Sequence, residues 1–313
     1  MIVVGVVNNM QDSALRTTER QFRELLAAAA GDRAIRVKFF SIAELPRERK
    51  GRAYVDTHYE DVANIAKAGL DGLIVTGTDP KGSVLVEEPY YNPLTELVDW
   101  AQEHTVSTVW SCLAAHAAVQ HLDGVSRERF PQKLAGVFSC ELTASHPILA
   151  GMPSRWTMPH SRHNTLPGKP LDAAGYQLLS TADGAGPDMF IKQGKSLFLF
   201  VQGHPEYDPG ALLREYRRDV GRFLSGERDS YPDMPNNYFD EAAVAAATAF
   251  RDLAIRTRDP KLLDHFPFSG SGDGMAHPWH DSAVRLYSNW LSFLEDHRAK
   301  RAGQRQSSSA AAT

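Results

Sequence analysis

The stretch VSTVWSCLAAHAAVQHL, residues 106–122, joins an apolar run of strand type to a helical pattern at Cys112. A tight turn from a strand into a helix exposes the side chain at the turn, and the small residues Ala114 and Ala115 let backbones approach closely. The N–H groups that begin a helix favour a thiolate and a developing oxyanion. The pattern makes Cys112 a candidate nucleophile, and the alternative is a buried structural cysteine at the end of a strand.

A second strand of this kind ends in polar residues. Residues 197–209 read LFLFVQGHPEYDP, so an apolar strand is followed directly by His204 and Glu206. A cysteine nucleophile needs a base, and the base needs an acceptor that orients it. If this strand lies beside the one that ends at Cys112, the histidine and the glutamate can fill both roles. The alternative is a loop histidine with a solvated glutamate.

Strand and helix patterns alternate outward from these two segments. In the first third of the chain we expect strands at 2–7, 35–40, 73–76 and 106–110, and helices at 17–30, 56–68 and 93–104. This alternation is typical of βαβ units. It predicts an α/β fold with a doubly wound, mainly parallel sheet, helices on both faces and a ligand crevice at the carboxyl ends of the strands.

The middle and the end of the chain have a different character. Short strands separated by Gly, Pro and Asp clusters indicate mixed or antiparallel pairing; they are expected at 136–140, 176–180, 189–191 and 196–201. Extra helices are expected at 209–224, 239–255 and 281–297. Residues 298–313 are basic and then rich in Ser and Ala, which predicts a disordered tail. We therefore expect a single domain over residues 1–297.

Composition excludes several classes of function. The 313 residues carry 34 Lys and Arg against 38 Asp and Glu, a net charge of −4. No basic field is available to hold nucleic acid or an anionic membrane, so neither is expected as a partner. The start of the chain lacks the charged n-region of a signal peptide, and its apolar run at residues 2–7 is too short for a membrane span. With only two cysteines, Cys112 and Cys140, a disulfide framework is excluded, and we expect a cytoplasmic protein.

Metal and nucleotide motifs are weak. His160 and His163 have a spacing of three in a segment expected to be a loop, and His277 and His280 repeat that spacing near Trp279. Neither pair has a Cys or carboxylate at zinc spacing. No metal is therefore expected. The stretch GTDPKG at 77–82 lacks the end of a phosphate-binding loop, and no GxGxxG follows the first strand. Nucleotide hydrolysis and hydride transfer have no support.

Ordered segments carry a resemblance over residues 2–294. They are DGLIVTG (71–77), VSTVWSC (106–112), QKLAGVF (132–138), PHSR (159–162), FVQGHPEYD (200–208), REYRRDV (214–220), PNNYF (235–239) and SNWL (288–291). Together they resemble the homoserine O-acyltransferase family of methionine biosynthesis, which comprises homoserine O-succinyltransferases and their acetyl-transferring relatives. The resemblance implies a class I glutamine-amidotransferase-like (flavodoxin-like) fold and a homodimer.

The resemblance also implies roles for individual residues. Cys112 matches the acyl-accepting nucleophile, His204 the general base and Glu206 its orienting carboxylate. Arg218 matches the arginine that holds the amino-acid carboxylate, and Lys133 and Ser161 match positions that line the substrate pocket. The implied reaction is ping-pong transfer from succinyl-CoA or acetyl-CoA, used as a substrate with no permanently bound cofactor, to the hydroxyl of homoserine or of a similar amino acid such as serine. The oxyanion is expected at the N–H of Leu113 and the loop at Gly77.

The chain departs from the family pattern at three places. The loop that begins at Asn8 lacks the family's active-site lysine, and whether Arg16 substitutes for it is open. Leu113 follows the nucleophile where the family usually has Trp. Counting without gaps places Lys81 at the position associated with acyl choice, and a shift of one residue places Gly82 there. Either way an acidic residue is missing, which favours succinyl.

Two other functions stay open at this point. The same Cys-His-Glu arrangement hydrolyses glutamine in glutamine amidotransferases, although no synthetase domain accompanies it here. A specialised-metabolism paralogue with a different acceptor is the second alternative, because the loop lysine and the Trp are both replaced.

Overall fold

The computed structural model describes residues 1–80, 82, 84–268 and 275–310, with side chains as far as Arg298. Lys81, one of the candidate specificity residues, lies outside the described residues. Among the residues described, ten strands form one sheet, in the order β3-β2-β1-β4-β5-β10-β9-β8-β6-β7. No described helix is long and apolar enough to cross a membrane.

One half of the sheet is parallel. It consists of β3 (Glu60–Asp61), β2 (Ile35–Ser41), β1 (Ile2–Val7), β4 (Gly72–Val75), β5 (Ser107–Ser111) and β10 (Leu197–Val201). The other half is antiparallel, with β9 (Gly186–Gln193), β8 (Gln177–Ala182), β6 (Glu128–Leu142) and β7 (Arg155–Thr165). The prediction of an α/β fold with a mainly parallel sheet continued by mixed pairing is confirmed.

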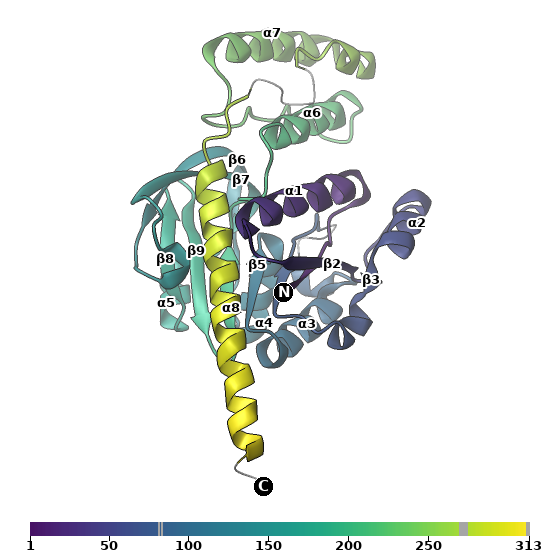
Figure 1. Cartoon of the computed structure of the whole chain (residues 1–313). Coiled ribbons are helices and arrows are strands. Elements are labelled where there is room, and N and C mark those ends of the chain that lie inside the picture. The colour runs from purple at the N-terminus through teal and green to yellow at the C-terminus, as the bar shows by residue number, and fades with distance from the viewer. Residues whose placement is uncertain (81, 83, 269–274, 311–313) are drawn as a thin grey trace.

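Helices cover both faces of this sheet (Figure 1). Helices α1 (Asp12–Ala30) and α8 (His280–Ala310) pack on one face, and α3 (Tyr91–His104), α4 (Leu113–Asp123) and α5 (Gly168–Ala173) pack on the other. Strand β10 shows why both faces are apolar: Leu197, Leu199 and Val201 join the first core, and Phe198 and Phe200 join the second. A strand buried on both faces reads as a continuous hydrophobic run, as in parallel sheets generally.

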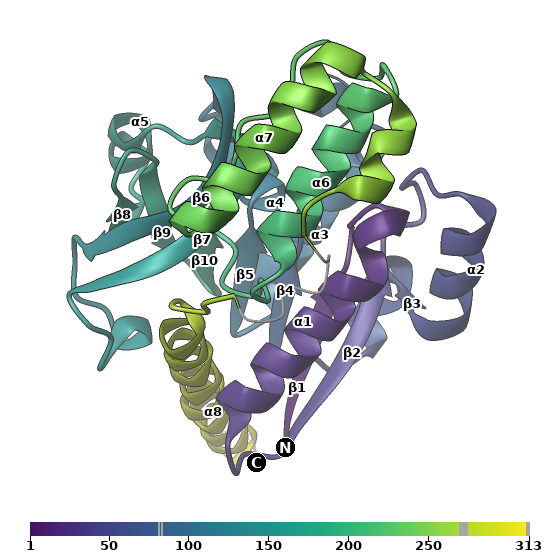
Figure 2. The ribbon, with the colours of Figure 1, turned by 90° about the horizontal axis from the view of Figure 1, so that it is seen from above.

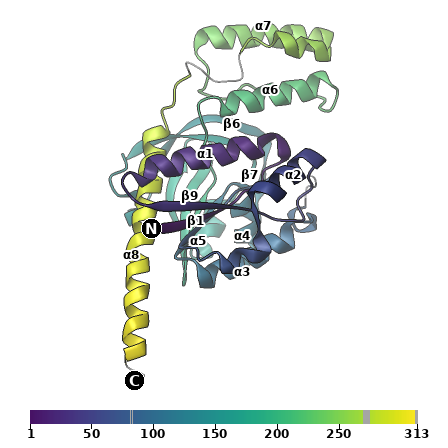
Figure 3. The same cartoon turned by 45° about the vertical axis from the view of Figure 1, so that its right-hand side comes forward.

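The carboxy-terminal region adds a small lobe above α1. Helix α6 (Ala211–Leu224) lies next to α1, and α7 (Glu241–Thr257) lies outermost over α6 (Figures 1 and 3). Seen from above, α6 and α7 run side by side (Figure 2). With the 3₁₀ helix η4 (Pro260–His265) they enclose a separate apolar cluster that includes Tyr216, Phe223 and Phe250. The lobe therefore has its own core.

Two segments differ from the sequence prediction. Residues 56–68 are not one helix. Helix α2 (Arg49–His58) ends at His58, and Asp61 caps a new 3₁₀ helix, η1 (Val62–Lys67), by accepting a hydrogen bond from the Ala63 N–H. The segment around His160 is not a loop but strand β7, which pairs with β6 at the edge of the sheet. The sequence prediction missed this strand because Pro159 lies within it. Proline is tolerated in edge strands, and β7 lies at the edge of this sheet.

The end of the last helix also differs from expectation. Helix α8 continues past residue 297, where we expected the domain to end, as far as Ala310. Its first part crosses the sheet face, and the rest projects beyond it (Figures 1 and 3). The extent of the domain itself, residues 1–297, stays a prediction.

Candidate active site

The turn at Cys112 has the geometry that the sequence suggested. The residue stands between the end of β5 and the first turn of α4, with φ 51° and ψ −115°. A positive φ is costly for a residue with a side chain and persists only where surrounding contacts impose it. Here the Cys112 N–H donates a 2.8 Å hydrogen bond to the Val201 carbonyl at the end of β10. The turn is thus fixed to the strand that leads to His204.

His204 lies beside Cys112 because β5 and β10 are parallel neighbours. Their register pairs Leu197 with Ser107 and Val201 with Ser111, so both strands end at the same edge of the sheet. The Cys112 thiol and the His204 imidazole line the same cavity, and the thiol is one of the groups that raise the pKa of His204. On the other side of the ring, Nδ1 lies 2.8 Å from the Glu206 Oε1. The structure therefore brings the three predicted catalytic residues into one row at this edge of the sheet.

Electrostatics favour a protonated imidazole in this row. Burial by itself would lower the pKa of His204, but the Glu206 carboxylate and the hydrogen bonds to Cys112 and Glu206 raise that pKa well above its ordinary value. A charged imidazole can stabilise a neighbouring thiolate and can give a proton to a leaving group. This arrangement suits covalent acyl transfer through sulfur.

Tyr207 holds the imidazole from its face. The two rings are stacked with their centroids 4.3 Å apart and an interplanar angle of 16°. The Tyr207 hydroxyl donates to Glu215, and the backbone N–H of His204 donates to the Pro159 carbonyl at 2.8 Å. The base is therefore held by contacts from α6 and β7 as well as by Glu206.

Gly77 and the N–H of Leu113 meet beside the nucleophile. A Cβ atom on Gly77 would lie 2.9 Å from the Leu113 nitrogen and 3.1 Å from its Cβ, so only glycine allows the loop after β4 to come this close. Leu113 is the first residue of α4, and the helix itself does not use the N–H at this position. These two predicted oxyanion positions are adjacent in the structure.

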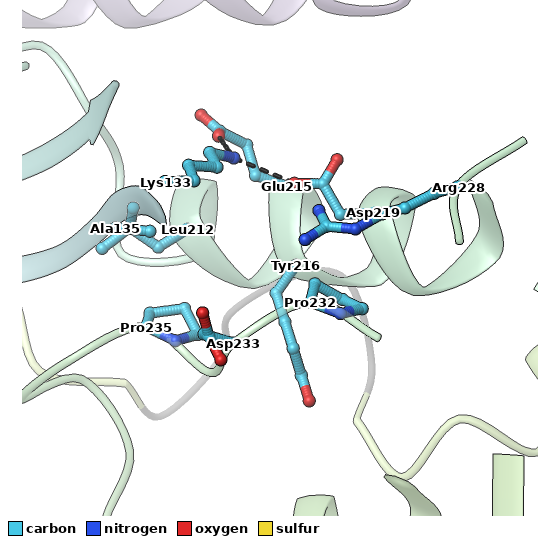
Figure 4. Close-up of a pocket in the computed structure, with 10 residues that line it drawn as sticks. All are labelled: Lys133, Ala135, Leu212, Glu215, Tyr216, Asp219, Arg228, Pro232, Asp233 and Pro235. Carbon is cyan, nitrogen blue, oxygen red and sulfur yellow. Dashed lines mark hydrogen bonds and ion pairs between the residues drawn. The ribbon is translucent and has the colours of Figure 1, made fainter. Parts of the chain in front are cut away.

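A cluster of charges faces the same space from α6 and β6. Lys133 Nζ lies 3.1 Å from Glu215 Oε2 and 2.9 Å from Asp219 Oδ2, and Arg218 Nη2 lies 2.9 Å from Asp219 Oδ1. Ser161 Oγ also donates to Glu215. Figure 4 is a close-up of a small adjoining cavity that Tyr216 also lines, and it shows Lys133 between the carboxylates of Glu215 and Asp219. Burial disfavours the charge on Glu215, but Lys133 and Arg218 lower its pKa to about 2.

One cavity of about 270 Å³ joins the thiol, the imidazole and this charge cluster. It is lined by most of the predicted site residues: Gly77, Cys112, Lys133, Ser161, His204, Glu206 and Arg218. Arg16 does not line it and lies instead on a neighbouring groove. Arg16 therefore does not take the place of the family's loop lysine inside this cavity.

Sequence reasoning missed several residues of this cavity, among them three that contact the predicted ones. Tyr207, Glu215 and Asp219 line it together with the predicted residues. The sequence did contain a signal for two of them. Glu215 lies three residues before Arg218 and Asp219 lies four residues after Glu215, so both belong to the same helix as the predicted Arg218. Tyr207 follows Glu206 directly in the sequence. What these charged side chains contact depends on the fold, which brings Lys133 of β6 and Ser161 of β7 to Glu215.

Cys140 lies in a separate, fully buried polar cluster. Cys140, His160 and Asp188 offer ligand atoms that lie within 4.8 Å of one another. Hydrogen bonds already engage these groups: Arg162 Nε donates to His160 Nδ1 at 3.2 Å, and Ser180 Oγ donates to Asp188 at 2.9 Å. Burial raises the pKa of the Cys140 thiol above its ordinary value. Cys140 is thus a buried core thiol, and the absence of a metal stays a prediction.

The fold and the site define the class of protein first. One parallel strand ends in a turn that carries the candidate nucleophile, and the neighbouring strand is followed by a histidine and a glutamate. The α/β fold that carries both strands is of the class I glutamine amidotransferase type. A glutamine amidotransferase from Methylobacillus flagellatus matches 93% of this chain and 94% of its own, with a TM-score of 0.50 and 14% identity. That likeness concerns the fold alone.

Sequence comparison then gives the family. The model of the family described as homoserine O-succinyltransferase matches residues 1–300. A homoserine O-succinyltransferase from Rhodopseudomonas palustris is 47% identical over 294 residues, covering 94% of this chain and 88% of the relative. One from Methylorubrum extorquens is 45% identical over 293 residues, covering 94% and 87%. The chain belongs to the homoserine O-succinyltransferase family, and the prediction of an acyltransferase enzyme of this kind is confirmed.

Proposed function

We propose that this protein transfers the succinyl group of succinyl-CoA to the hydroxyl of L-homoserine, through a thioester on Cys112. The observation that carries the proposal is the single cavity in which the thiol and imidazole face a cluster of charges of both signs. An amino acid is a zwitterion, and this cluster offers cations for its carboxylate and carboxylates for its ammonium group. The names of the relatives supply the succinyl group and the homoserine.

The first half-reaction moves the acyl group to the protein. The Cys112 sulfur attacks the thioester carbonyl, and a new carbon–sulfur bond forms as the bond to the CoA sulfur breaks. The proton held on His204 passes to the departing CoA thiolate. The Leu113 N–H and the backbone at Gly77 donate to the oxyanion that develops between these events.

The second half-reaction moves the acyl group to the acceptor. His204, now neutral, takes the proton of the acceptor hydroxyl while the hydroxyl oxygen attacks the acyl carbon. The bond to the Cys112 sulfur breaks, and the thiolate returns beside the imidazolium. Glu206 keeps the ring oriented and stabilises its charged form in both steps.

Arg218 is the residue proposed to bind the acceptor carboxylate. Its guanidinium is partly exposed at the cavity, and a planar fork of donors matches a carboxylate well. Lys133 and Ser161 are proposed to act with it. Both engage Glu215, and so they hold the carboxylate that faces the acceptor ammonium.

The donor and the acceptor are tested together by a matrix of activities. Acetyl-CoA and succinyl-CoA are each combined with homoserine and serine, and we expect succinyl-CoA with homoserine to give the largest kcat/KM. Glutaminase activity is measured on the same preparation. Release of ammonia from glutamine without acyl transfer would replace this proposal with the hydrolase alternative.

Two further expectations belong to the same proposal. We expect a homodimer, because closed symmetric dimers are common among enzymes and the family resemblance implies one. We also expect the protein to act in the cytoplasm with no nucleic acid or membrane partner. Light scattering on the purified protein tests the dimer, and fractionation of cells tests the location.

A further inference from the structure

Tyr207 connects the candidate base to the charge cluster on α6. Its ring is stacked on the His204 imidazole with the centroids 4.3 Å apart, and its hydroxyl donates to Glu215 Oε1 at 2.5 Å. The residue is 8% exposed and lines the same cavity as Cys112. An aromatic ring is rigid, so one side chain holds the imidazole and the Glu215 carboxylate at a fixed separation.

The backbone of Tyr207 is held separately from its ring. Its carbonyl accepts a 2.8 Å hydrogen bond from the Trp279 indole N–H, and His277 Nε2 lies 3.2 Å from the same oxygen. Its N–H donates to the His204 carbonyl at 3.1 Å. With the backbone fixed at these points, only the side-chain torsions of Tyr207 are left free. The stack on His204 and the hydroxyl bond to Glu215 fix these torsions.

The two carboxylate oxygens of Glu215 are used unequally. Oε2 accepts hydrogen bonds from Lys133 Nζ at 3.1 Å and from the Ser161 hydroxyl. Among the described residues, Oε1 accepts a hydrogen bond from Tyr207 alone. A carboxylate offers about four acceptor positions on its two oxygens, so Oε1 has capacity for a further donor. An acceptor ammonium group that binds Glu215 is therefore expected beside the Tyr207 hydroxyl.

We propose that Tyr207 is a positioning residue that couples binding of the acceptor to abstraction of its proton. It holds the carboxylate that meets the ammonium group at a fixed separation from the imidazole that takes the hydroxyl proton. This inference rests on the proposed function, in which homoserine carries both groups on one short carbon chain. A small displacement of either protein group then misaligns the attacking hydroxyl. The first half-reaction involves no ammonium group, so the Tyr207 hydroxyl acts in the second half-reaction alone.

The test compares the two half-reactions in Tyr207→Phe, which keeps the ring and removes the hydroxyl. Its matched control is Tyr91→Phe, which removes a hydroxyl at the start of α3, on a residue that does not line the cavity. We expect kcat/KM for homoserine to fall about tenfold in the test variant and to be unchanged in the control. Formation of the Cys112 thioester from succinyl-CoA, followed by rapid quenching and mass spectrometry, should proceed at the wild-type rate in both.

Two further variants separate the hydroxyl from the ring. In a Glu215→Gln background, Tyr207→Phe should lower kcat/KM for homoserine by less than about twofold, because the amide no longer binds the ammonium group that the hydroxyl positions. Tyr207→Leu removes the stack on His204 as well, so it should slow both half-reactions.

Several outcomes would overturn the inference. One is an equal loss in both half-reactions of Tyr207→Phe, which would indicate a merely structural role. Others are a loss no larger than in Tyr91→Phe, equal effects of Tyr207→Phe in the two backgrounds, and a thioester formed as fast in Tyr207→Leu as in Tyr207→Phe. In each of these cases the wild type still transfers the succinyl group, so the proposed function stands. A wild type that transfers nothing to homoserine would remove the proposed function, and this inference with it.

Discussion

The N–H of Cys112 donates a 2.8 Å hydrogen bond to the carbonyl of Val201, and this bond couples the two halves of the candidate site. Val201 ends the strand that leads to His204, three residues further on. The thiol and the imidazole are therefore positioned by adjacent backbones in one sheet rather than by independent loops. A rigid scaffold of this kind keeps the distance between a nucleophile and its base constant through the reaction.

Replacing the nucleophile should remove the covalent intermediate. Cys112→Ala and Cys112→Ser should lower kcat/KM by at least about 10³-fold, because neither side chain can form the thioester. Mass spectrometry of the intact protein after incubation with succinyl-CoA should show a succinyl adduct on the wild type and on Cys140→Ser, but not on either Cys112 variant. A wild type that carries no adduct with any short acyl-CoA would count heavily against the mechanism.

A methyl group at Gly77 should damage the oxyanion site. In Gly77→Ala the added Cβ would lie 2.9 Å from the Leu113 nitrogen, so the loop and the helix start must separate. We expect kcat to fall about 10²-fold with a smaller change in KM. Gly194→Ala is the control, because the nearest atom to its added Cβ is 3.7 Å away. Similar kcat values for the two variants would show that the close approach is not needed for catalysis.

The Glu206 contact should be visible as a pH dependence of stability. The pKa of His204 is raised in the folded protein by Glu206, so the stabilisation is fully present below the ordinary histidine pKa of about 6.5 and is lost as pH rises through the folded-state value. Glu206→Gln should therefore lower the melting temperature relative to the wild type at about pH 6 and much less at high pH.

NMR and a surface variant check this result. The His204 ring signals should titrate at a lower pH in Glu206→Gln than in the wild type. Glu96→Gln, which removes an exposed carboxylate on α3, should change neither the His204 titration nor the melting temperature. An unchanged His204 titration in Glu206→Gln would remove Glu206 from the role of orienting acceptor.

Glu215 should give the opposite pH dependence. Its folded-state pKa is lowered to about 2, chiefly by Lys133 and Arg218 acting against burial, so its stabilisation is present above the ordinary value and is lost as pH falls toward about 2. Glu215→Gln should cost about 2 kcal/mol in the free energy of unfolding near neutral pH, and less below about pH 4. Denaturant titrations at several pH values measure this, and a cost independent of pH would contradict it.

The sequence predicted the core of this architecture because its signals are local. The apolar strands 2–7, 106–110 and 196–201 each end in a recognisable break, and the candidate catalytic residues that follow the last two line one cavity. Strand β7 was missed because Pro159 interrupts its pattern, and pairing with β6 decides its structure instead. The role of Glu215 also depended on tertiary contacts, since its partners Lys133 and Ser161 come from strands far away in the chain.

The separate core of the lobe formed by α6, α7 and η4 bears on how such an enzyme can diversify. Glu215, Arg218 and Asp219 stand on α6, whose outward face packs into that lobe, whereas Cys112 is fixed by the sheet. Under the proposed function, α6 meets the amino acid and Cys112 carries the acyl group, so a substitution in α6 alters the first without moving the second. After gene duplication, a new acceptor would then require only a few changes in one helix.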